Sequence, residues 1–494
     1  MATASRGPQQ LKDRVVQSRI HRERDRFIAS IPEDRVLALA SSYRDATPCE
    51  FFSPPKRGSY NVCYFVQFPD QVKWVVRVPL SPCLALGARS KLESEVATMQ
   101  LVASKTTIPI PLLIAYALSD NPEPLSSFLI LEFIDGQKLD LRKVRDLTEE
   151  QQTNLYTSLA DIYIQLRRLE FPSIGCLVLD SGDAQVGKRT ISLDINMQEL
   201  EGLQPSEIQA SYYTSDGRLI SASQYVAMLL EISDNAFAKG RSSVPDREAG
   251  CDTLYHLHLF HEFAKKWVDP SLDQGPFVMV HGDLEPYNLI VSDSMSIISV
   301  LDWEWSRVVP RQFFIPPLWL DFFDTTMLAY KVFYDAYLEK FERLLAIVRT
   351  RELERFGKPL LADEWAAAKQ NSGFLVANAL ENWTDMDWFA HRYVNRRWFR
   401  GQDEKGLKDR VEAFMNEDPA RQALITAKLD EGRAYQADVE RLKKGSDAAS
   451  PLVALKHTWT RLPGVTWGAI AAVLFAGTYW VGNRIVRFHF RRHN

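Results

Sequence analysis

Val280-His281-Gly282-Asp283-Leu284-Glu285-Pro286-Tyr287-Asn288, followed by Leu301-Asp302-Trp303-Glu304, is the stretch that decides the fold of this 494-residue chain. It places an aspartate five residues before an asparagine, and a second aspartate after a short segment. A phosphoryl-transfer site needs one carboxylate that accepts a proton from the attacking hydroxyl. It also needs an amide and a second carboxylate that hold a metal ion on the phosphates. The stretch therefore predicts such a site.

The segments around these side chains predict how they meet. Apolar runs at 277–280, 289–291 and 297–301 predict three short strands. Turn-forming residues separate the last two runs, so we expect a hairpin centred near Met295. In this hairpin Asn288 would lie opposite Asp302, with Cα atoms roughly 4.5–5.5 Å apart. Two oxygen-bearing side chains that close can share one Mg2+.

The alternative is that these residues are ordinary loop polars that cap a hairpin, because short motifs of this kind recur by chance. The coincidence of the first strand, His-Gly-Asp, the asparagine, the hairpin and the second aspartate favours the functional interpretation. His281 is a candidate catalytic residue beside Asp283, either as a general base or as a support of the loop. Glu304 is not expected to bind the metal ion directly. We expect it either next to the residues that bind the metal or at the protein surface.

The motif His281-Gly282-Asp283-Leu284-x-Pro286-x-Asn288, with Asp302-Trp303-Glu304, resembles the catalytic loop and metal motif of the aminoglycoside phosphotransferase family, closest to its fungal members. The resemblance runs over residues 25–400. It implies an α+β, protein-kinase-like fold, with a small β-rich N-terminal lobe, a large helical C-terminal lobe, and ATP and Mg2+ between them. It also implies transfer of the γ-phosphate of ATP to a small-molecule hydroxyl, with Asp283 as base and Asn288 and Asp302 as metal ligands.

A cation and an acidic partner are expected in the N-terminal lobe. The sequence predicts two strands and a following helix there, at 60–68, 72–78 and 91–104. In kinase-like lobes the second strand carries a cation that binds the ATP phosphates, and the helix carries its acidic partner. The resemblance assigns these positions to Arg77 and Glu95, with arginine in place of the family's usual lysine. The rivals for the two positions are Lys73 and Glu93.

Two further segments complete the expected nucleotide site. Gly58 and Ser59 lie in a proline-containing loop whose backbone N–H groups could cradle a phosphate; a surface turn is the alternative. The apolar run 128–134 resembles the strand that joins the two lobes. Backbone groups of Glu132 and Ile134 would then contact adenine.

The composition is consistent with a globular enzyme. The chain is 46% hydrophobic and 25% charged, with a net charge of −4, so no basic excess indicates a nucleic-acid partner. Its five cysteines are scattered and lack Cys-x-x-Cys spacing, which favours a reducing compartment and argues against zinc.

The sequence predicts six segments along the chain. They are a polar lead-in at 1–26, the N-terminal lobe at 27–135, the C-terminal lobe at 136–445 with an insertion near 180–250 and the catalytic loop at 281–304, a linker at 446–463, a hydrophobic helix at 464–482 and a basic tail at 483–494.

The hydrophobic helix is the second notable feature of the chain. Residues 464–482 carry no charge, and their length just meets the roughly 20 residues that span a bilayer. We expect a C-terminal membrane anchor in the mitochondrial outer membrane or the endoplasmic reticulum, with the lobes on the cytosolic side. A buried or amphipathic terminal helix is the alternative.

The acceptor is expected to be a small hydroxylated molecule. One group of acidic and aromatic residues could bind a cationic amine. The same pattern also fits the exposed surface of a helix that covers buried aromatic residues. The members of this acidic and aromatic group are Glu381, Trp383, Asp385, Asp387 and Trp388. Two other functions remain open: a choline- or ethanolamine-type kinase, and a non-catalytic, membrane-tethered pseudokinase. Arginine at position 77, and Tyr287 where relatives usually have glycine, keep the pseudokinase open. The sequence leaves the oligomeric state open.

Overall fold

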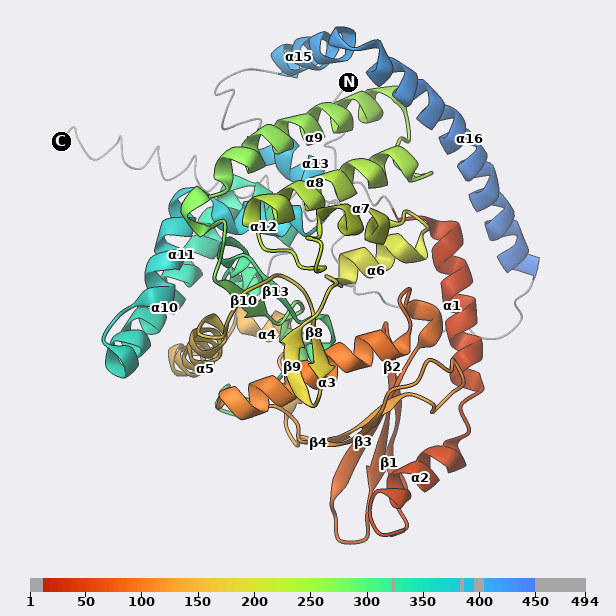
Figure 1. Ribbon diagram of the computed structural model, residues 1–494, viewed down its shortest axis with the longest axis vertical. Helices are drawn as coiled ribbons and strands as arrows, with labels where there is room; N and C mark the ends of the chain where they lie inside the picture. Colours follow the sequence, from red (N-terminus) through yellow and green to blue (C-terminus); the bar gives the residue numbers. More distant parts are fainter. Residues whose placement is uncertain (1–11, 322–324, 383–385, 395–403, 449–494) are drawn as a thin grey trace, which may run out of the picture. The chain divides into compact units, whose positions relative to one another are not determined.

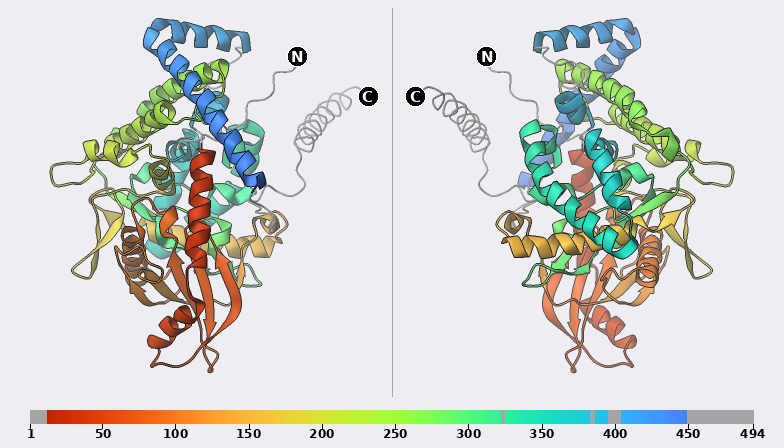
Figure 2. Two further views of the ribbon diagram at one scale, coloured as in Figure 1. Left: turned by 90° about the vertical axis from the view of Figure 1, so that its right-hand side faces the viewer. Right: turned by 90° about the vertical axis from the view of Figure 1, so that its left-hand side faces the viewer.

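The structure is a computed structural model that describes residues 12–321, 325–382, 386–394 and 404–448. Within these residues, the chain up to Val439 forms one compact unit, and the segment from Glu440 on belongs to a second. The N-terminal lobe and the C-terminal lobe up to Val439 lie within the first unit. The β-sheet of the N-terminal lobe and most of the helices of the C-terminal lobe lie at opposite ends of this unit (Figures 1 and 2).

The N-terminal lobe is built on a five-stranded antiparallel sheet with the strand order β1-β2-β3-β5-β4. Its strands are β1 (Glu50–Arg57), β2 (Asn61–Gln67), β3 (Lys73–Pro79), β4 (Leu113–Ala117) and β5 (Phe128–Glu132). Its helices are α1 (Arg14–Ala29), α2 (Glu33–Ser42), the 3-10 turn η1 (Ser81–Cys83) and α3 (Ala88–Lys105). The strands predicted at 60–68 and 72–78 and the helix predicted at 91–104 are thus confirmed as β2, β3 and α3.

The residue pattern explains why these elements form. Along β2 buried residues alternate with partly exposed ones, as expected for a strand with one face on a core. In α3 the apolar residues Leu92, Val96, Met99 and Val102 recur at helical spacing and are all buried. Polar residues of α3 are buried as well, among them Lys91 and Glu95. These polar groups require partners inside the protein.

The C-terminal lobe is mainly helical. Its helices are α4 (Leu141–Val144), α5 (Glu149–Arg167), α6 (Leu193–Leu200), α7 (Pro205–Tyr212), α8 (Ala222–Lys239), α9 (Arg247–Trp267), α10 (Lys331–Phe356), α11 (Leu360–Gln370), α12 (Gly373–Leu380), α13 (Met386–Phe389), α15 (Glu404–Glu417) and α16 (Pro419–Ala448). Helix α5 begins with a reciprocal capping box between Thr148 and Gln151, which satisfies two backbone N–H groups at the helix start. Large buried side chains of α5 and α10 share one core, among them Leu155, Leu159, Tyr337 and Phe341.

Short strands in this lobe position the candidate site. They are β6 (Gln137–Lys138), β7 (Glu170–Phe171), β8 (Leu177–Asp180), β9 (Asp183–Val186), β10 (Phe277–Val280), β11 (Leu289–Val291), β12 (Ile297–Val300) and β13 (Arg307–Val309). They form two three-stranded sheets, β13-β10-β7 and β12-β11-β6, and the hairpin β8-β9. The strands predicted at 277–280, 289–291 and 297–301 are therefore confirmed as β10, β11 and β12.

The insertion near 180–250 packs on the N-terminal lobe. Asn196 of α6 is buried; its side chain donates to the carbonyl of Cys83 at 3.0 Å and accepts from the N–H of Ala85 at 3.0 Å. These bonds hold the chain that leads from η1 into α3. The lead-in also packs: α1 runs past residue 26 to Ala29, and Asp13 at its N-terminus contacts Arg241 at 2.8 Å.

The predicted hydrophobic helix at 464–482 and basic tail at 483–494 lie outside the described residues, as does the linker from residue 449 on. Among the helices of the described ranges, none is both long enough and apolar enough to cross a bilayer.

Candidate active site

Two loops carry the candidate catalytic and metal-binding side chains. The His-Gly-Asp loop (residues 281–288) follows β10, and the Asp-Trp-Glu loop (residues 301–306) follows β12. Gly282 has a φ of +82°, and a Cβ at this position would lie 2.1 Å from the carbonyl oxygen of Trp305, so only glycine permits the approach. The hydroxyl of Ser306 donates to the carbonyl of His281 at 3.1 Å. The two loops therefore hold each other in place.

His281 supports both loops. Its Nε2 donates to the carbonyl of Leu301 at 3.0 Å, and its Nδ1 accepts from the N–H of Asp283 at 3.3 Å. The ring lies against Trp303, with centroids 4.5 Å apart. Burial lowers the pKa of His281 to about 4, although Asp302 opposes the shift, so the ring is neutral at neutral pH. Because both nitrogens are engaged, the geometry favours support of the loop over a role as general base.

Asp283 is held by two neighbouring side chains. Its carboxylate accepts from the Tyr287 hydroxyl at 2.7 Å and from Nδ2 of Asn288 at 3.1 Å. Burial raises the pKa of Asp283 to about 6, and repulsion from Asp302 adds to the shift, while the two hydrogen bonds oppose it. A carboxylate with a pKa just below neutral is ionised at neutral pH yet more basic than an exposed one. Both properties suit a proton acceptor.

The hairpin differs by one residue from the predicted register. Leu289 pairs with Val300, and the N–H of Leu301 donates to the carbonyl of Asn288 at 2.8 Å. Asn288 thus lies opposite Leu301, and the expectation that it faces Asp302 is wrong. The turn is centred on Ser294 and not on Met295, because the N–H of Ser292 donates to the carbonyl of Ser296 at 2.9 Å. The register shift between Ile290 and Val291 recovers only one of the two positions by which this turn displaces the pairing.

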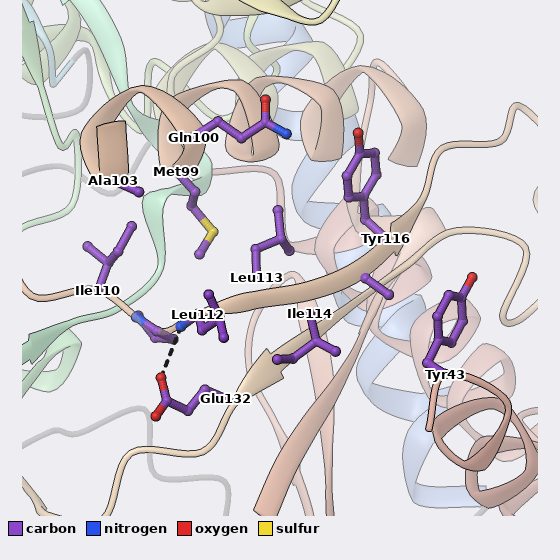
Figure 3. A pocket seen from close by; sticks show the side chains of 12 residues that line it. Tyr43, Met99, Gln100, Ala103, Ile110, Leu112, Leu113, Ile114, Tyr116 and Glu132 are labelled. Carbon is purple, nitrogen blue, oxygen red and sulfur yellow. Dashed lines mark hydrogen bonds between the residues drawn. The ribbon is translucent and has the colours of Figure 1, made fainter. Parts of the chain in front are cut away.

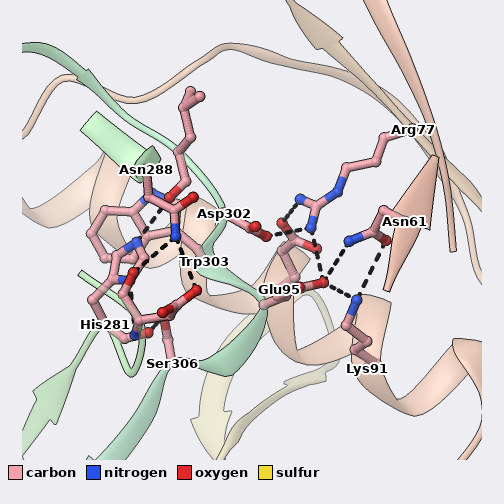
Figure 4. Close-up of polar contacts among 12 residues, drawn as sticks. Asn61, Arg77, Lys91, Glu95, His281, Asn288, Asp302, Trp303 and Ser306 are labelled. Atoms are coloured by element: carbon pink, nitrogen blue, oxygen red, sulfur yellow. Dashed lines mark hydrogen bonds and ion pairs between the residues drawn. The ribbon is translucent and has the colours of Figure 1, made fainter. Parts of the chain in front are cut away.

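Asp302 nevertheless lies beside this site because of its backbone. It has a φ of +68°, which is uncommon for a residue other than glycine and bends the chain sharply after β12. Figure 4 shows its carboxylate between Asn288 and Arg77. Left-handed residues of this kind often occur where function fixes the geometry.

Asn288 and Asp302 fit a magnesium site. Nδ2 of Asn288 faces Asp283 and one Asp302 oxygen faces Arg77, which leaves Oδ1 of Asn288 and Oδ2 of Asp302 without a hydrogen-bond donor among the described residues. Both atoms are oxygens, the ligands that Mg2+ prefers. Over the same ranges, no three His, Cys, Asp or Glu side chains group as a metal site. A Mg2+ ion here would complete its shell with phosphate and water, as this ion usually does.

Arg77 lies at the centre of a buried cluster of charges. Its guanidinium contacts Glu95 through Nη1 and both Asp302 and Glu304 through Nη2, the last at 2.9 Å. The structure thus pairs Arg77 with Glu95 and not with Glu93, and joins β3 to α3 and to the Asp-Trp-Glu loop (Figure 4). Burial alone would raise the pKa of Asp302, but Arg77, with smaller contributions from Lys91 and His281, holds that pKa below its usual value.

Glu304, Lys91 and Asn61 complete the cluster, and no role was predicted for Lys91 or Asn61. Glu304 is buried and accepts from Nδ2 of Asn61 at 2.7 Å, and its carboxylate also pairs with the Lys91 ammonium. The sequence did hold one signal for Lys91, which precedes Glu95 by four residues and so lies on the same face of α3. No local pattern points to Asn61, whose partner is 243 residues away.

The cluster contains three carboxylates and only two cationic side chains. When all five groups are ionised, the excess is one negative charge. Of the three carboxylates, Asp302 is the most exposed, at 30% of its side-chain surface, against 1% for Glu95 and 3% for Glu304. A divalent cation at Asp302 would offset this charge at the open side of the cluster.

The remaining nucleotide candidates lie apart from this cluster. Lys73 pairs with Asp135 at 3.1 Å, so the structure does not bring this rival of Arg77 to Asp302. Gly58 and Ser59 are exposed, and the N–H of Gly58 already donates to the carbonyl of Asn61 at 2.8 Å. This N–H would have to leave its turn before it could bind a phosphate.

The expected adenine-binding segment has one available backbone donor. The N–H of Glu132 donates to the carbonyl of Leu112 at 2.9 Å, and the N–H of Phe133 donates to the carbonyl of Lys73 at 3.2 Å. The N–H of Ile134 has no acceptor among the described residues. Of the two residues expected to contact adenine, Ile134 therefore has the available donor.

A groove of about 610 Å³ lies between α3 and the edge strand β4 (Figure 3). Its walls are mainly apolar and include Met99, Leu113 and Tyr116. Glu132 reaches it, where its carboxylate accepts from the N–H of Leu112 at 3.2 Å. The Glu132 side chain is thus directed to the groove, and the lining includes neither Arg77 nor Asp302.

The acidic and aromatic group offered for an amine acceptor is engaged in internal contacts. Glu381 pairs with the buried Arg307, and Asp387 is buried and accepts from the Thr253 hydroxyl at 3.0 Å. These contacts favour the alternative of a helix surface over buried aromatics. Two further members lie outside the described residues, Trp383 and Asp385.

Comparison with known proteins identifies the family of this chain. The model of the phosphotransferase enzyme family matches residues 52–347, more than half of the chain. Clavilactone A biosynthesis cluster protein Y of Ampulloclitocybe clavipes is 27% identical over 244 residues, which cover 49% of this chain and 56% of that protein. Altered inheritance of mitochondria protein 9 of Meyerozyma guilliermondii is 24% identical over 125 residues, which cover 25% of this chain and 20% of that protein. The chain thus spans about half of the first relative and a fifth of the second.

Solved structures with a similar arrangement include two antibiotic phosphotransferases. Macrolide 2'-phosphotransferase type I is 13% identical, with a TM-score of 0.39 over 74% of this chain and 96% of that chain. The GDP complex of wild-type aminoglycoside 2'-phosphotransferase-IIIa is 13% identical, with a TM-score of 0.40 over 82% of this chain and 98% of that chain.

Proposed function

The chain belongs to the phosphotransferase enzyme family, and from this membership and the geometry of its two loops we propose that it transfers the γ-phosphate of ATP to a hydroxyl group of a small molecule. One observation carries the proposal: a proton-accepting carboxylate, Asp283, adjoins Asn288, and the paired Asp302 and Arg77 lie beside them. Positive charge for phosphates, oxygen ligands for a cation and a base for the acceptor thus meet at one place.

Each side chain has a defined task in this reaction. Asp283 accepts the proton of the acceptor hydroxyl, which would take the place of the Tyr287 hydroxyl at the carboxylate. Arg77, held by Glu95, contributes the positive charge that attracts the phosphates. Asn288 and Asp302 would hold Mg2+, which when bound neutralises charge on the phosphates. Positioning and electrostatic stabilisation would provide most of the rate.

The acceptor can be sought with a panel of hydroxylated small molecules. Incubation of the protein with ATP, Mg2+ and each compound should release ADP with at least one of them and yield a phosphorylated product by mass spectrometry. Turnover confined to choline or ethanolamine would favour the alternative amino-alcohol kinase. Binding of ATP without turnover on any compound would favour a pseudokinase.

ATP with Mg2+ is expected to protect Cys63 from alkylation. Cys63 is partly exposed on β2 and lies directly opposite Arg77 in the β2–β3 pair, so phosphates bound to Arg77 would cover its thiol. The measurement is iodoacetamide labelling with and without nucleotide, followed by peptide mass spectrometry. Cys251 on α9, also partly exposed, serves as the control that should label equally in both samples. Equal labelling of Cys63 would place the nucleotide elsewhere.

The rate of transfer should depend on pH through Asp283. The base works only when deprotonated, and its pKa is raised to about 6. Therefore kcat/KM should rise about tenfold per pH unit below this value and level off above it. Tyr287→Phe removes a hydrogen bond that favours the carboxylate, so its midpoint should move to higher pH. A profile that is flat from pH 5 to pH 8 would contradict Asp283 as the base.

A further inference from the structure

Glu304 joins the Asp-Trp-Glu loop to the N-terminal lobe. A single oxygen, Oε2, meets Nδ2 of Asn61 at 2.7 Å, Nη2 of Arg77 at 2.9 Å and the Lys91 ammonium. The three donors come from β2, β3 and α3, three different elements of the N-terminal lobe. Because these three donors converge on one oxygen of Glu304, this residue attaches the Asp-Trp-Glu loop to the N-terminal lobe.

Lys91 is enclosed on all sides by its partners. Its side chain is 4% exposed, and its ammonium lies 5.7 Å from the ring centre of Tyr60 and 5.6 Å from that of Trp305. It also donates to Oδ1 of Asn61 at 3.4 Å. A buried ammonium is costly unless it is paired, and here Glu304 and Trp305 of the Asp-Trp-Glu loop supply two of the partners. Lys91 therefore holds that loop at two successive residues.

We propose that Lys91 is a positioning residue. By binding Glu304, it holds the carboxylate of Asp302, two residues earlier, in the position from which this carboxylate can contact both Arg77 and a divalent cation. The inference rests on the proposed function. Two cations face Glu304 in the present arrangement, Arg77 and Lys91. Without Lys91, only Arg77 would neutralise this buried carboxylate, so the guanidinium would be drawn to Glu304 and away from Asp302 and the phosphates.

The geometry distinguishes this role from simple support of the fold. A purely structural residue would lower stability and the fraction of active enzyme, which reduces kcat but leaves the KM for MgATP unchanged. By contrast, a residue that determines whether Arg77 contacts Glu304 alone or both Glu304 and Asp302 affects the binding of MgATP, so its loss raises the KM for MgATP. The KM for the acceptor should stay constant, because Asp283 is held by Tyr287 and Asn288.

The test compares Lys91→Met, Glu304→Gln and the double variant in the full-length protein, with Lys105→Met as the control. Lys105 is exposed at the C-terminal end of the same helix. Lys91→Met should raise the KM for MgATP by about 10–100-fold, the usual effect of losing a residue that orients a metal ligand. The double variant should be closer to wild type than Lys91→Met, because the glutamine leaves no unpaired charge for Arg77 to neutralise. Lys105→Met should match wild type.

Two results would overturn the inference. One is a wild-type KM for MgATP in Lys91→Met together with a lower melting temperature. The other is a double variant whose losses are the product of the two single variants. If Lys91→Met does not fold, the double variant carries the test, since removal of both charges should restore folding and a near-normal KM.

Calorimetric titration of the wild-type protein with MgATP separates this inference from the proposed function. If wild type binds no MgATP, the proposed function fails and the inference falls with it. If wild type and Lys91→Met bind MgATP equally, only the inference fails.

Discussion

Asp283→Ala is expected to lower kcat for phosphoryl transfer by about 10²–10⁴-fold, the usual contribution of a positioned general base. The affinity for MgATP should change little, because the phosphates are expected on Arg77 and the cation on Asn288 and Asp302. The measurement pairs steady-state turnover, on whichever acceptor the compound screen identifies, with calorimetric titration of MgATP.

The control for this variant is Asp293→Ala. Asp293 is exposed in the turn of the same hairpin and bonds only to Gln137 among the described residues, at 3.2 Å. Its replacement should leave turnover and affinity at wild-type values. Retained turnover in Asp283→Ala would remove this residue from the role of base.

Asp302→Ala is expected to weaken MgATP binding by at least about 10–100-fold, the loss seen even for residues that only orient a metal ligand. The carboxylate is the most exposed member of the cluster around Arg77, and its pKa is held low, so it is ionised and ready to bind a cation. Loss of this carboxylate would remove both a metal ligand and one partner of Arg77.

Titration of ATP with and without Mg2+ isolates the metal contribution. Wild type should bind ATP more tightly with Mg2+, and Asp302→Ala should lose most of this difference. Asp293→Ala again serves as the control. If Asp302→Ala binds MgATP as tightly as wild type, Asp302 is not a metal ligand.

Local sequence patterns were sufficient for much of the fold. The β2 and β3 strands, the α3 helix and the hairpin of β11 and β12 follow from apolar spacing and turn residues within short windows. The two lobes follow from the family that these motifs indicate. The hairpin register did not follow, because the turn residues between Ser292 and Ser296 allow more than one centre, and the irregularity between Ile290 and Val291 leaves no distinct sequence signal.

The candidate site was predictable from local sequence where its members lie in one short motif, and the family resemblance supplied the pairing of Arg77 with Glu95. Asp283 and Asn288 are five residues apart and contact each other directly. The role of Glu304 was not predictable, because its partners Asn61, Arg77 and Lys91 are more than 200 positions away in the chain and contact it only through tertiary packing. The contacts of the acidic and aromatic group were not predictable for the same reason. Its members Glu381 and Asp387 contact Arg307 and Thr253, which are far from them in the sequence.

A crystal structure with a non-hydrolysable ATP analogue and Mn2+ tests the central claim most directly, since Mn2+ replaces Mg2+ and gives an anomalous signal. The account predicts one anomalous peak within coordination distance of Oδ1 of Asn288 and the carboxylate of Asp302. The phosphates should lie on Arg77 and the γ-phosphate should face Asp283. A peak away from these two side chains, or a nucleotide bound elsewhere than between β3 and the Asp-Trp-Glu loop, would contradict it.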